Sequence, residues 1–267
     1  MLNTFINFSL YILLTLSCAR FQQQKIETDI LSRIQTSGEL RVATTGDYRP
    51  FTYLSSNGSY SGMDIELAKN LADALNVNLI FVKTSWPTLS EDLKNNRFDI
   101  AMGGISRTVE REKIGSMSLG YITSGKTPVA RCSDKIRFQT LEQIDQKDVK
   151  VIVNPGGTNE KFVRENLKKS SITVYQDNNT IFKQIVENKV DVMITDSTEV
   201  DLVVKLYPTL CAVTPGKTFD QSEKVYFMPK DMAWKTYVNK WLDPLIKENF
   251  VSIKYQEALK HFSSEKN

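Results

Sequence analysis

The sequence predicts an α/β protein of two similar lobes with a ligand-binding cleft between them. Strand-like and helix-like segments alternate along residues 40–102 and again along residues 149–195. Such alternation is typical of mainly parallel sheets covered by helices. A short pattern also repeats, because residues 96–102 (NRFDIAM) resemble residues 188–194 (NKVDVMI) in the order of their polar and apolar side chains.

The first unit is expected to contain strands at 40–44, 79–82 and 100–102, with helices at 63–75 and after Pro87. The second unit is expected to contain strands at 149–153, 172–175 and 190–195, with helices at 160–167 and 180–186. Ligands of open α/β sheets bind beyond the carboxyl ends of the strands. The turns that follow these strands are therefore predicted to line the cleft.

Composition limits the classes of function. The chain has 267 residues, and 34 Lys and Arg stand against 31 Asp and Glu, which gives a formal net charge of +3. This charge is too small and too scattered for a nucleic-acid-binding surface. The expected partner is a small molecule, and the composition does not decide between a monomer and a homo-oligomer.

The first 19 residues carry no charged side chain, and their apolar part is too short to span a bilayer. We interpret residues 1–19 as a secretory signal peptide, which predicts a periplasmic or secreted protein without a transmembrane segment in the mature chain. Cys18 leaves a second interpretation open, in which this residue carries a lipid anchor.

Two cysteines, Cys132 and Cys211, remain after the signal segment. In an oxidising compartment a disulfide is the natural pairing, and two buried free thiols are the alternative. We expect the bond near the connections between the lobes. No metal site is expected, because His261 is the single histidine and no cysteines or histidines have the spacing of ligands.

Asp196 and Glu199 follow the buried segment 190–195. One interpretation is structural, because an Asp at the N-cap of a helix and a Glu three residues later can satisfy the first amides of that helix. The other is functional, because two carboxyl groups lie where a strand end would meet a cleft.

Three further strand ends carry polar or aromatic groups. Arg111 can bind a carboxylate with both arms of its guanidinium, or can lie on a solvated helix face. The turn Asn154–Thr158 can present backbone amides to an anion, or can be an ordinary strand-to-helix turn. Trp86 can stack on a ring or belong to the core.

Longer strings resemble a known family. The segments RVATTGDY, TSWP, RFDIAM, RFQTLEQIDQ, IVNPGGTNEKF and LCAV are similar to those of periplasmic cyclohexadienyl dehydratases, which have the type II solute-binding fold. The resemblance extends from about residue 31 to beyond residue 229. It implies one lobe from residues 31–128 and 224–267 and a second lobe from residues 129–223.

The resemblance also implies an activity. Enzymes of this family convert prephenate to phenylpyruvate, and L-arogenate to L-phenylalanine, by loss of water and carbon dioxide. One general acid and tight orientation of the substrate suffice for this chemistry, and no cofactor is required. The alternative is a non-catalytic amino-acid-binding component of an ABC transporter, which would share the fold.

The family pattern assigns a role to particular positions. Glu199 matches the general acid, Arg111 the anchor of a substrate carboxylate, and Asp196 the acid that accepts an ammonium group in amino-acid binders. Asp47 is a less well supported wall residue, together with Tyr48. Other positions match the lining of the dehydratase cleft: Trp86, Ser106, Lys126, Asn154 and Thr158.

Overall fold

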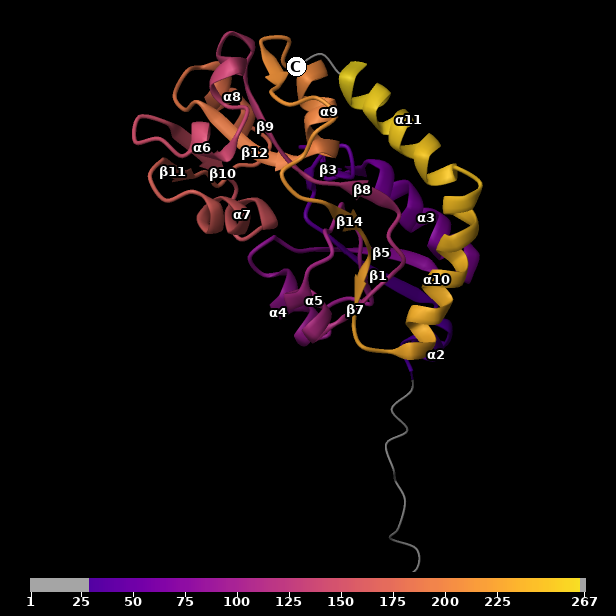
Figure 1. The fold of residues 1–267 in the computed structure, drawn as a ribbon. Coiled ribbons are helices and arrows are strands. Elements are labelled where there is room, and N and C mark those ends of the chain that lie inside the picture. The colour runs from indigo at the N-terminus through magenta and orange to yellow at the C-terminus, as the bar shows by residue number, and fades with distance from the viewer. Residues whose placement is uncertain (1–28, 265–267) are drawn as a thin grey trace, which may run out of the picture.

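The computed structural model describes residues 29–264, which form two α/β lobes (Figure 1). The predicted fold class is confirmed. The signal peptide at residues 1–19 and the lipid anchor at Cys18 lie outside the described residues. Within the described residues, no helix has both the length and the apolar character needed to span a bilayer.

The first lobe is built on a five-stranded sheet in the order β5-β1-β6-β15-β7. β1 pairs in parallel with β5 and β6, whereas β15 is antiparallel to β6 and β7. The strands are β1 (Glu39–Thr44), β5 (Asn78–Lys83), β6 (Ile100–Ala101), β7 (Ser116–Met117) and β15 (Phe227–Met228). Its helices are α2 (Ile30–Ser37), α3 (Met63–Leu75), α4 (Leu89–Lys94), α5 (Val109–Ile114), α10 (Met232–Lys247) and α11 (Phe250–Ser264).

The second lobe repeats this plan with the order β11-β10-β12-β9-β13. β10 is parallel to β11 and β12, and β9 is antiparallel to β12 and β13. The strands are β9 (Lys126–Arg131), β10 (Lys150–Val153), β11 (Ser171–Val174), β12 (Val192–Asp196) and β13 (Leu210–Ala212). Its helices are the 3-10 helix η2 (Cys132–Arg137), α6 (Leu141–Ile144), α7 (Thr158–Asn166), α8 (Ile181–Val186) and α9 (Ser197–Leu206).

The repeated sequence pattern has the same structural role in both lobes. Asp99 accepts a hydrogen bond from the backbone N–H of Arg41 at 2.8 Å, and Asp191 accepts one from the backbone N–H of Lys150, also at 2.8 Å. Each aspartate thereby ties the start of one parallel strand, β6 or β12, to its neighbour in the sheet, β1 or β10. Each aspartate also forms an ion pair with an arginine, Asp99 with Arg41 and Asp191 with Arg131.

The chain crosses between the lobes twice, through the antiparallel pair β8 (Ile122–Ser124) and β14 (Ser222–Lys224). The first crossing enters the second sheet at Lys126, three residues before the predicted boundary. A small antiparallel sheet beside the cleft consists of β2 (Asp47–Tyr48), β3 (Thr52–Leu54) and β4 (Tyr60–Ser61).

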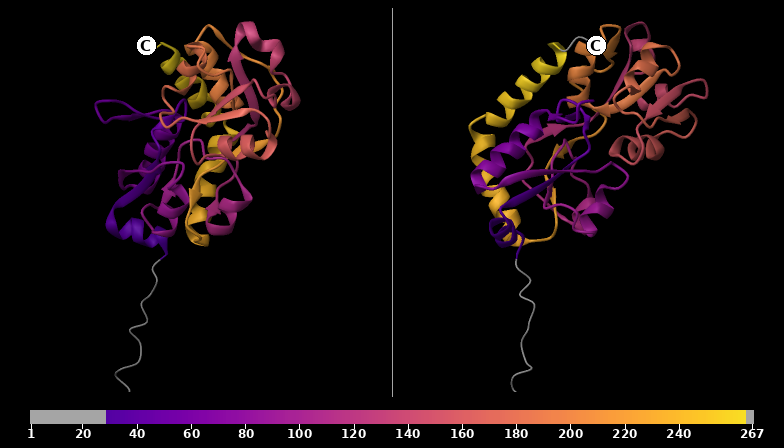
Figure 2. Two further views of the ribbon diagram at one scale, coloured as in Figure 1. Left: turned by 90° about the vertical axis from the view of Figure 1, so that its left-hand side faces the viewer. Right: turned by 180° about the vertical axis from the view of Figure 1, so that it is seen from behind.

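The C-terminal helices cover one side of the first lobe, as the further views show (Figure 2). α11 continues past α3 to α9 of the second lobe (Figure 1). The hydroxyl of Tyr255 lies 3.0 Å from the carbonyl oxygen of Thr198 and 3.0 Å from the carboxylate of Asp201. This helix therefore fixes the first turns of α9 against the first lobe.

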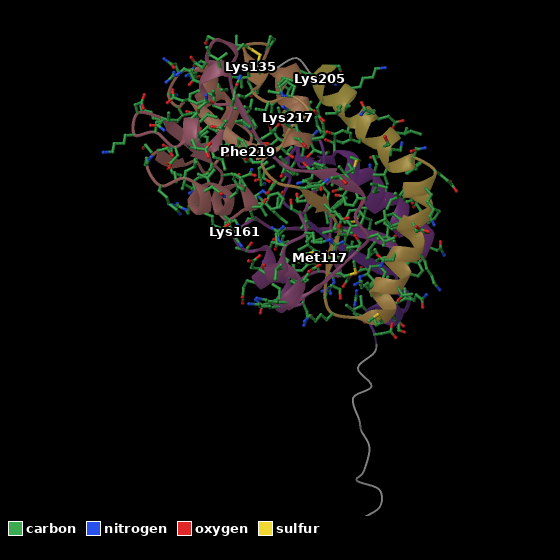
Figure 3. The ribbon with its side chains drawn as sticks, viewed as in Figure 1. Met117, Lys135, Lys161, Lys205, Lys217 and Phe219 are labelled. Carbon is green, nitrogen blue, oxygen red and sulfur yellow. A yellow bond between two sulfur atoms is a disulfide. The ribbon has the colours of Figure 1, made fainter. Side chains whose placement is uncertain are left out.

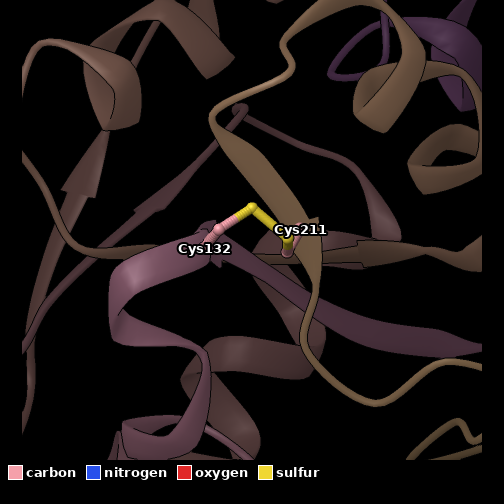
Figure 4. Close-up of a disulfide and its surroundings, with 2 residues drawn as sticks. All are labelled: Cys132 and Cys211. Carbon is pink, nitrogen blue, oxygen red and sulfur yellow. A yellow bond between two sulfur atoms is a disulfide. The ribbon is translucent and has the colours of Figure 1, made fainter.

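Cys132 and Cys211 form the predicted disulfide (Figure 4). The predicted location near the connections between the lobes is wrong. β9 begins at the crossing with Lys126 and ends at Arg131, about 17 Å further on at the rise of a strand. The bond therefore joins η2 to β13 at the far end of the second lobe, beside Lys135 (Figure 3).

Candidate functional site

Asp196 is the centre of a buried charge cluster where β12 ends. Its Oδ1 accepts a hydrogen bond from Lys126 Nζ at 2.9 Å, and its Oδ2 accepts from Lys224 Nζ at 2.6 Å and from the Tyr48 hydroxyl at 2.6 Å. Lys126 reaches Asp196 because the two residues are partners in the β9–β12 register. Lys224 arrives on the second crossing, so the cluster joins both lobes and the connection between them.

The cluster decides the ionisation of its members. Burial alone would raise the pKa of Asp196, but the ammonium groups of Lys126 and Lys224 outweigh it and hold that pKa well below its usual range. Burial lowers the pKa of Lys224, and the charge of Asp196 opposes this shift. Asp196 is therefore an ionised carboxylate between two lysines.

The structural interpretation of Asp196 and Glu199 is wrong. Asp196 occupies the N-cap position of α9, but its side chain accepts no hydrogen bond from the helix amides. The two ammonium groups bind its oxygens instead, because charge-assisted hydrogen bonds are stronger than neutral ones. Glu199 does not reach back to the backbone of Asp196 and bonds to the hydroxyl of Thr195.

Glu199 is buried in the first turn of α9, with 4% of its surface exposed. Burial raises its pKa to about 8, and the negative charge of Asp196 acts in the same direction. The hydrogen bond from Thr195 and the charges of Lys224 and Lys126 oppose this shift. Near neutral pH the Glu199 carboxyl is therefore mainly protonated, as a general acid must be.

Arg111 lies in α5, whose N-cap residue Thr108 accepts the backbone N–H of Arg111. The predicted alternative of a solvated arginine is wrong, because only 8% of its surface is exposed. Its Nη1 donates to the carbonyl oxygen of Ser106 at 2.7 Å, and no carboxylate among residues 29–264 forms a salt bridge with it. Burial lowers its pKa to about 10, so it stays cationic at neutral pH.

A cavity of about 20 Å³ lies between the lobes. This volume holds a water molecule but not a six-membered ring, so the structure shows the closed arrangement. Asn178 Nδ2 donates to the carbonyl oxygen of Asp47 across the cleft at 2.8 Å. Lys161, at the border between the lobes (Figure 3), bonds to Glu110 at 2.5 Å. Substrate entry therefore requires the lobes to separate.

The structure brings most of the predicted site residues together. Lys126 lies under this cavity, where its Nζ donates to Asp196, Asn159 and, at 2.9 Å, Thr158. Asp47 and Glu199 instead line a neighbouring cavity, and Asp47 accepts from Trp86 Nε1 at 3.1 Å. The predicted residues that line the central cavity are Tyr48, Trp86, Ser106, Arg111, Asn154, Thr158 and Asp196.

Lys224 was not predicted, and Asn159 and Thr195 lie at or beyond the ends of predicted strands but were assigned no role. Lys224 is fully buried and also donates to Ser106 Oγ at 3.0 Å. Its position directly before the apolar run 225–228 was a signal of burial, but its partner depends on where the second crossing lies. Asn159 donates to Thr195 Oγ1 at 2.9 Å and to Asn154 Oδ1 at 3.2 Å, and thus connects the glycine-rich turn to the end of β12.

The donor set suits an organic anion. It combines one guanidinium, two lysines, hydroxyls and amides with one ionised and one protonated carboxyl group. Across residues 29–264, no group of three or more His, Cys, Asp or Glu side chains has the arrangement of a metal site.

Residues 40–257 match the family described as bacterial extracellular solute-binding proteins, family 3. A cyclohexadienyl dehydratase of Pseudomonas aeruginosa is 53% identical over 227 residues, which cover 85% of this chain and 84% of that protein. The L-cystine-binding protein TcyJ of Escherichia coli is 28% identical over 195 residues, which cover 73% of this chain and 72% of that protein.

Solved structures give the same two kinds of relative. A crystal structure of an ancestral cyclohexadienyl dehydratase is 49% identical, covers 88% of this chain and 98% of that chain, and has a TM-score of 0.56. An ancestral amino-acid-binding protein, described as a precursor of cyclohexadienyl dehydratase, is 32% identical and has a TM-score of 0.79. The match covers 87% of this chain and 100% of that chain.

Proposed function

The chain belongs to family 3 of the bacterial extracellular solute-binding proteins, and we propose that it uses this fold as a carbon–oxygen lyase, a cyclohexadienyl dehydratase. The resemblance stated from the sequence is confirmed by the 53% identical relative of that name. The substrates are prephenate and L-arogenate, and the products are phenylpyruvate and L-phenylalanine. An exported location suits the family and the disulfide.

The observation that carries this proposal is the charge balance of the closed cleft. Arg111, Lys126 and Lys224 supply three positive charges and Asp196 supplies one negative charge, while Glu199 is mainly neutral below a pH of about 8. Two net positive charges remain. Prephenate carries two carboxylates, so its charge complements that of the cleft.

The same cluster argues against a simple amino-acid binder. An amino acid needs a carboxylate that accepts its ammonium group, and Asp196 is the matching position. Here both oxygens of Asp196 already accept hydrogen bonds from lysine ammonium groups at 2.9 and 2.6 Å. An incoming ammonium would have to displace one of them against like-charge repulsion, so the cleft favours prephenate over L-arogenate as well as over simple amino acids.

The proposed reaction uses these groups as follows. Arg111 holds a substrate carboxylate, and the lysines orient the dianion in a site from which water is excluded. Glu199 donates its proton to the ring hydroxyl as the carbon–oxygen bond breaks, and water leaves. The bond to the ring carboxylate breaks, carbon dioxide leaves, and the electron pair of that bond completes the aromatic ring.

The direct test is to mix the purified protein with prephenate and to measure phenylpyruvate formation. We expect catalytic turnover without added cofactor. The same preparation should bind arginine and cystine weakly in calorimetry. Tight amino-acid binding without phenylpyruvate formation would instead establish the transporter component.

A further inference from the structure

A second cavity, of about 510 Å³, lies beside the central cavity, and we name it the α9 cavity. One wall is a face of α9, because Glu199, Leu202, Val203 and Leu206 recur at helical spacing. The cavity reaches the surface at the exposed residues Asn179, Lys183 and Val186. The remaining lining residues are Asp47, Arg49, Tyr53, Asn178, Thr180, Phe182 and Tyr207.

Glu199 separates the two cavities. On one side Glu199 lines the α9 cavity. On the other side it accepts a hydrogen bond from Thr195, whose hydroxyl also accepts from Asn159 in the lining of the central cavity. Glu199 therefore borders a solvent-connected space that lies apart from the central cavity.

The proposed reaction consumes a proton in each turnover. Prephenate dianion plus one proton gives phenylpyruvate monoanion, carbon dioxide and water. The proton leaves Glu199 in the water molecule, so Glu199 ends each turnover as a carboxylate. It must take up a proton from the solvent before the next substrate can react.

We propose that the α9 cavity is the water-filled route through which Glu199 is reprotonated, an inference that rests on the proposed function. Its volume accommodates several water molecules, and polar groups line it from Glu199 to the surface. Asn178 supports a hydrated cavity, because it is 7% exposed and its Oδ1 has no hydrogen-bond partner among residues 29–264. The central cavity has room for about one water and is closed while the lobes are together, so in the closed state the α9 cavity is the side of Glu199 that is connected to solvent.

Blocking the mouth of this cavity tests the route. We suggest Val186→Cys at the rim and Leu206→Cys deeper inside, each in protein carrying Cys18→Ser and labelled with a bulky aromatic maleimide. Cys132 and Cys211 are joined in the disulfide, so the new thiol is the reactive one. The matched control is Ile136→Cys with the same label, because Ile136 is 75% exposed in the same lobe and does not line the cavity.

Rapid-quench kinetics with excess prephenate separate the first turnover from later ones. Glu199 begins protonated at pH 7, so the first turnover of the labelled Val186→Cys protein should match that of the unlabelled protein. Later turnovers should be roughly tenfold slower or more, which produces a burst of one phenylpyruvate per site. The label on Leu206→Cys should enlarge this effect, and the label on Ile136→Cys should produce none.

Two results would overturn the route while leaving the proposed function intact. One is an unchanged steady-state rate after labelling Val186→Cys. The other is an equal slowing of the first and later turnovers. If the unlabelled protein forms no phenylpyruvate at all, the proposed function itself fails.

Discussion

The two lobes place different chemistry after the same repeated strand. Beyond β6 the first lobe has a glycine turn and then the helix that carries Arg111, whereas beyond β12 the second lobe has Asp196 and Glu199. Gly104 is required in the first turn, because it has a φ of +70° and a Cβ atom there would lie 2.6 Å from the ring of Tyr48. In the proposed mechanism the first lobe therefore supplies the guanidinium that binds an anion, and the second lobe supplies the acid.

The comparison also separates structural from functional residues within the repeat. Asp99 and Asp191 occupy equivalent positions and make equivalent hydrogen bonds to β1 and β10, respectively. The residues beyond the repeat have diverged in type and in partners. The equivalent aspartates thus stabilise the two sheets. The residues that follow each strand determine which chemical groups the lobe contributes to the cleft.

Loss of the acid from the second lobe should give the largest effect. Glu199→Gln keeps the size of the side chain and its hydrogen bond to Thr195 but removes the proton donor. We expect prephenate turnover to fall by roughly 10² to 10⁴ with little change in melting temperature. Glu257→Gln, on the exposed face of α11 where Glu257 pairs with Lys254, is the control. Near-normal turnover by Glu199→Gln would remove Glu199 from the mechanism.

Loss of Arg111, the proposed carboxylate anchor in the first lobe, should have the second-largest effect. Arg111→Ala leaves a substrate carboxylate without its guanidinium, so kcat/KM should fall by roughly two orders of magnitude, mostly through KM. Arg111→Lys retains the charge but not the planar fork, so its loss should be smaller but clear. Steady-state kinetics with prephenate measure both variants. Wild-type saturation by both would mean that another group binds the carboxylate.

The disulfide is confined to the second lobe, so its removal should weaken that lobe. It closes a loop with a sequence separation of 79. Cys132→Ser combined with Cys211→Ser should lower the free energy of unfolding by about 4 kcal/mol in the chain-entropy account. Urea denaturation measures this loss. Turnover per folded molecule should stay unchanged, because the bond lies far from the cleft, and a selective loss of turnover would contradict that placement.

A smaller effect should appear in the pH profile. The pKa of Glu199 is raised to about 8, so kcat/KM should fall as the pH rises through that value and the acid loses its proton. Lys224 opposes this raised pKa. In Lys224→Met the pH at which kcat/KM falls should therefore be higher by roughly one unit.

Lys217→Met serves as the control for this profile, because Lys217 is an exposed lysine of the second lobe (Figure 3). Its profile should coincide with that of the unsubstituted protein. If kcat/KM of Lys224→Met falls at the same pH as that of the unsubstituted protein, Lys224 does not set the ionisation of Glu199.

The sequence by itself determined the α/β class, the two similar lobes and the disulfide pairing. These features follow from local signals, because the periods of strands and helices and the residues at strand ends can be recognised from neighbouring residues. The family resemblance then identified most residues of the cleft and implied the roles of Arg111 and Glu199.

Only the tertiary structure decided which charges meet. Lys224 joins Asp196 because the second crossing passes the end of β12, and no local pattern encodes that approach. Because of this contact, the side chain of Asp196 binds two lysines and does not cap α9, since charge-assisted hydrogen bonds are stronger than those from neutral amides. Burial of Glu199 also depends on the packing of both lobes and α11 around α9, and that burial makes its carboxyl an acid that holds its proton at neutral pH.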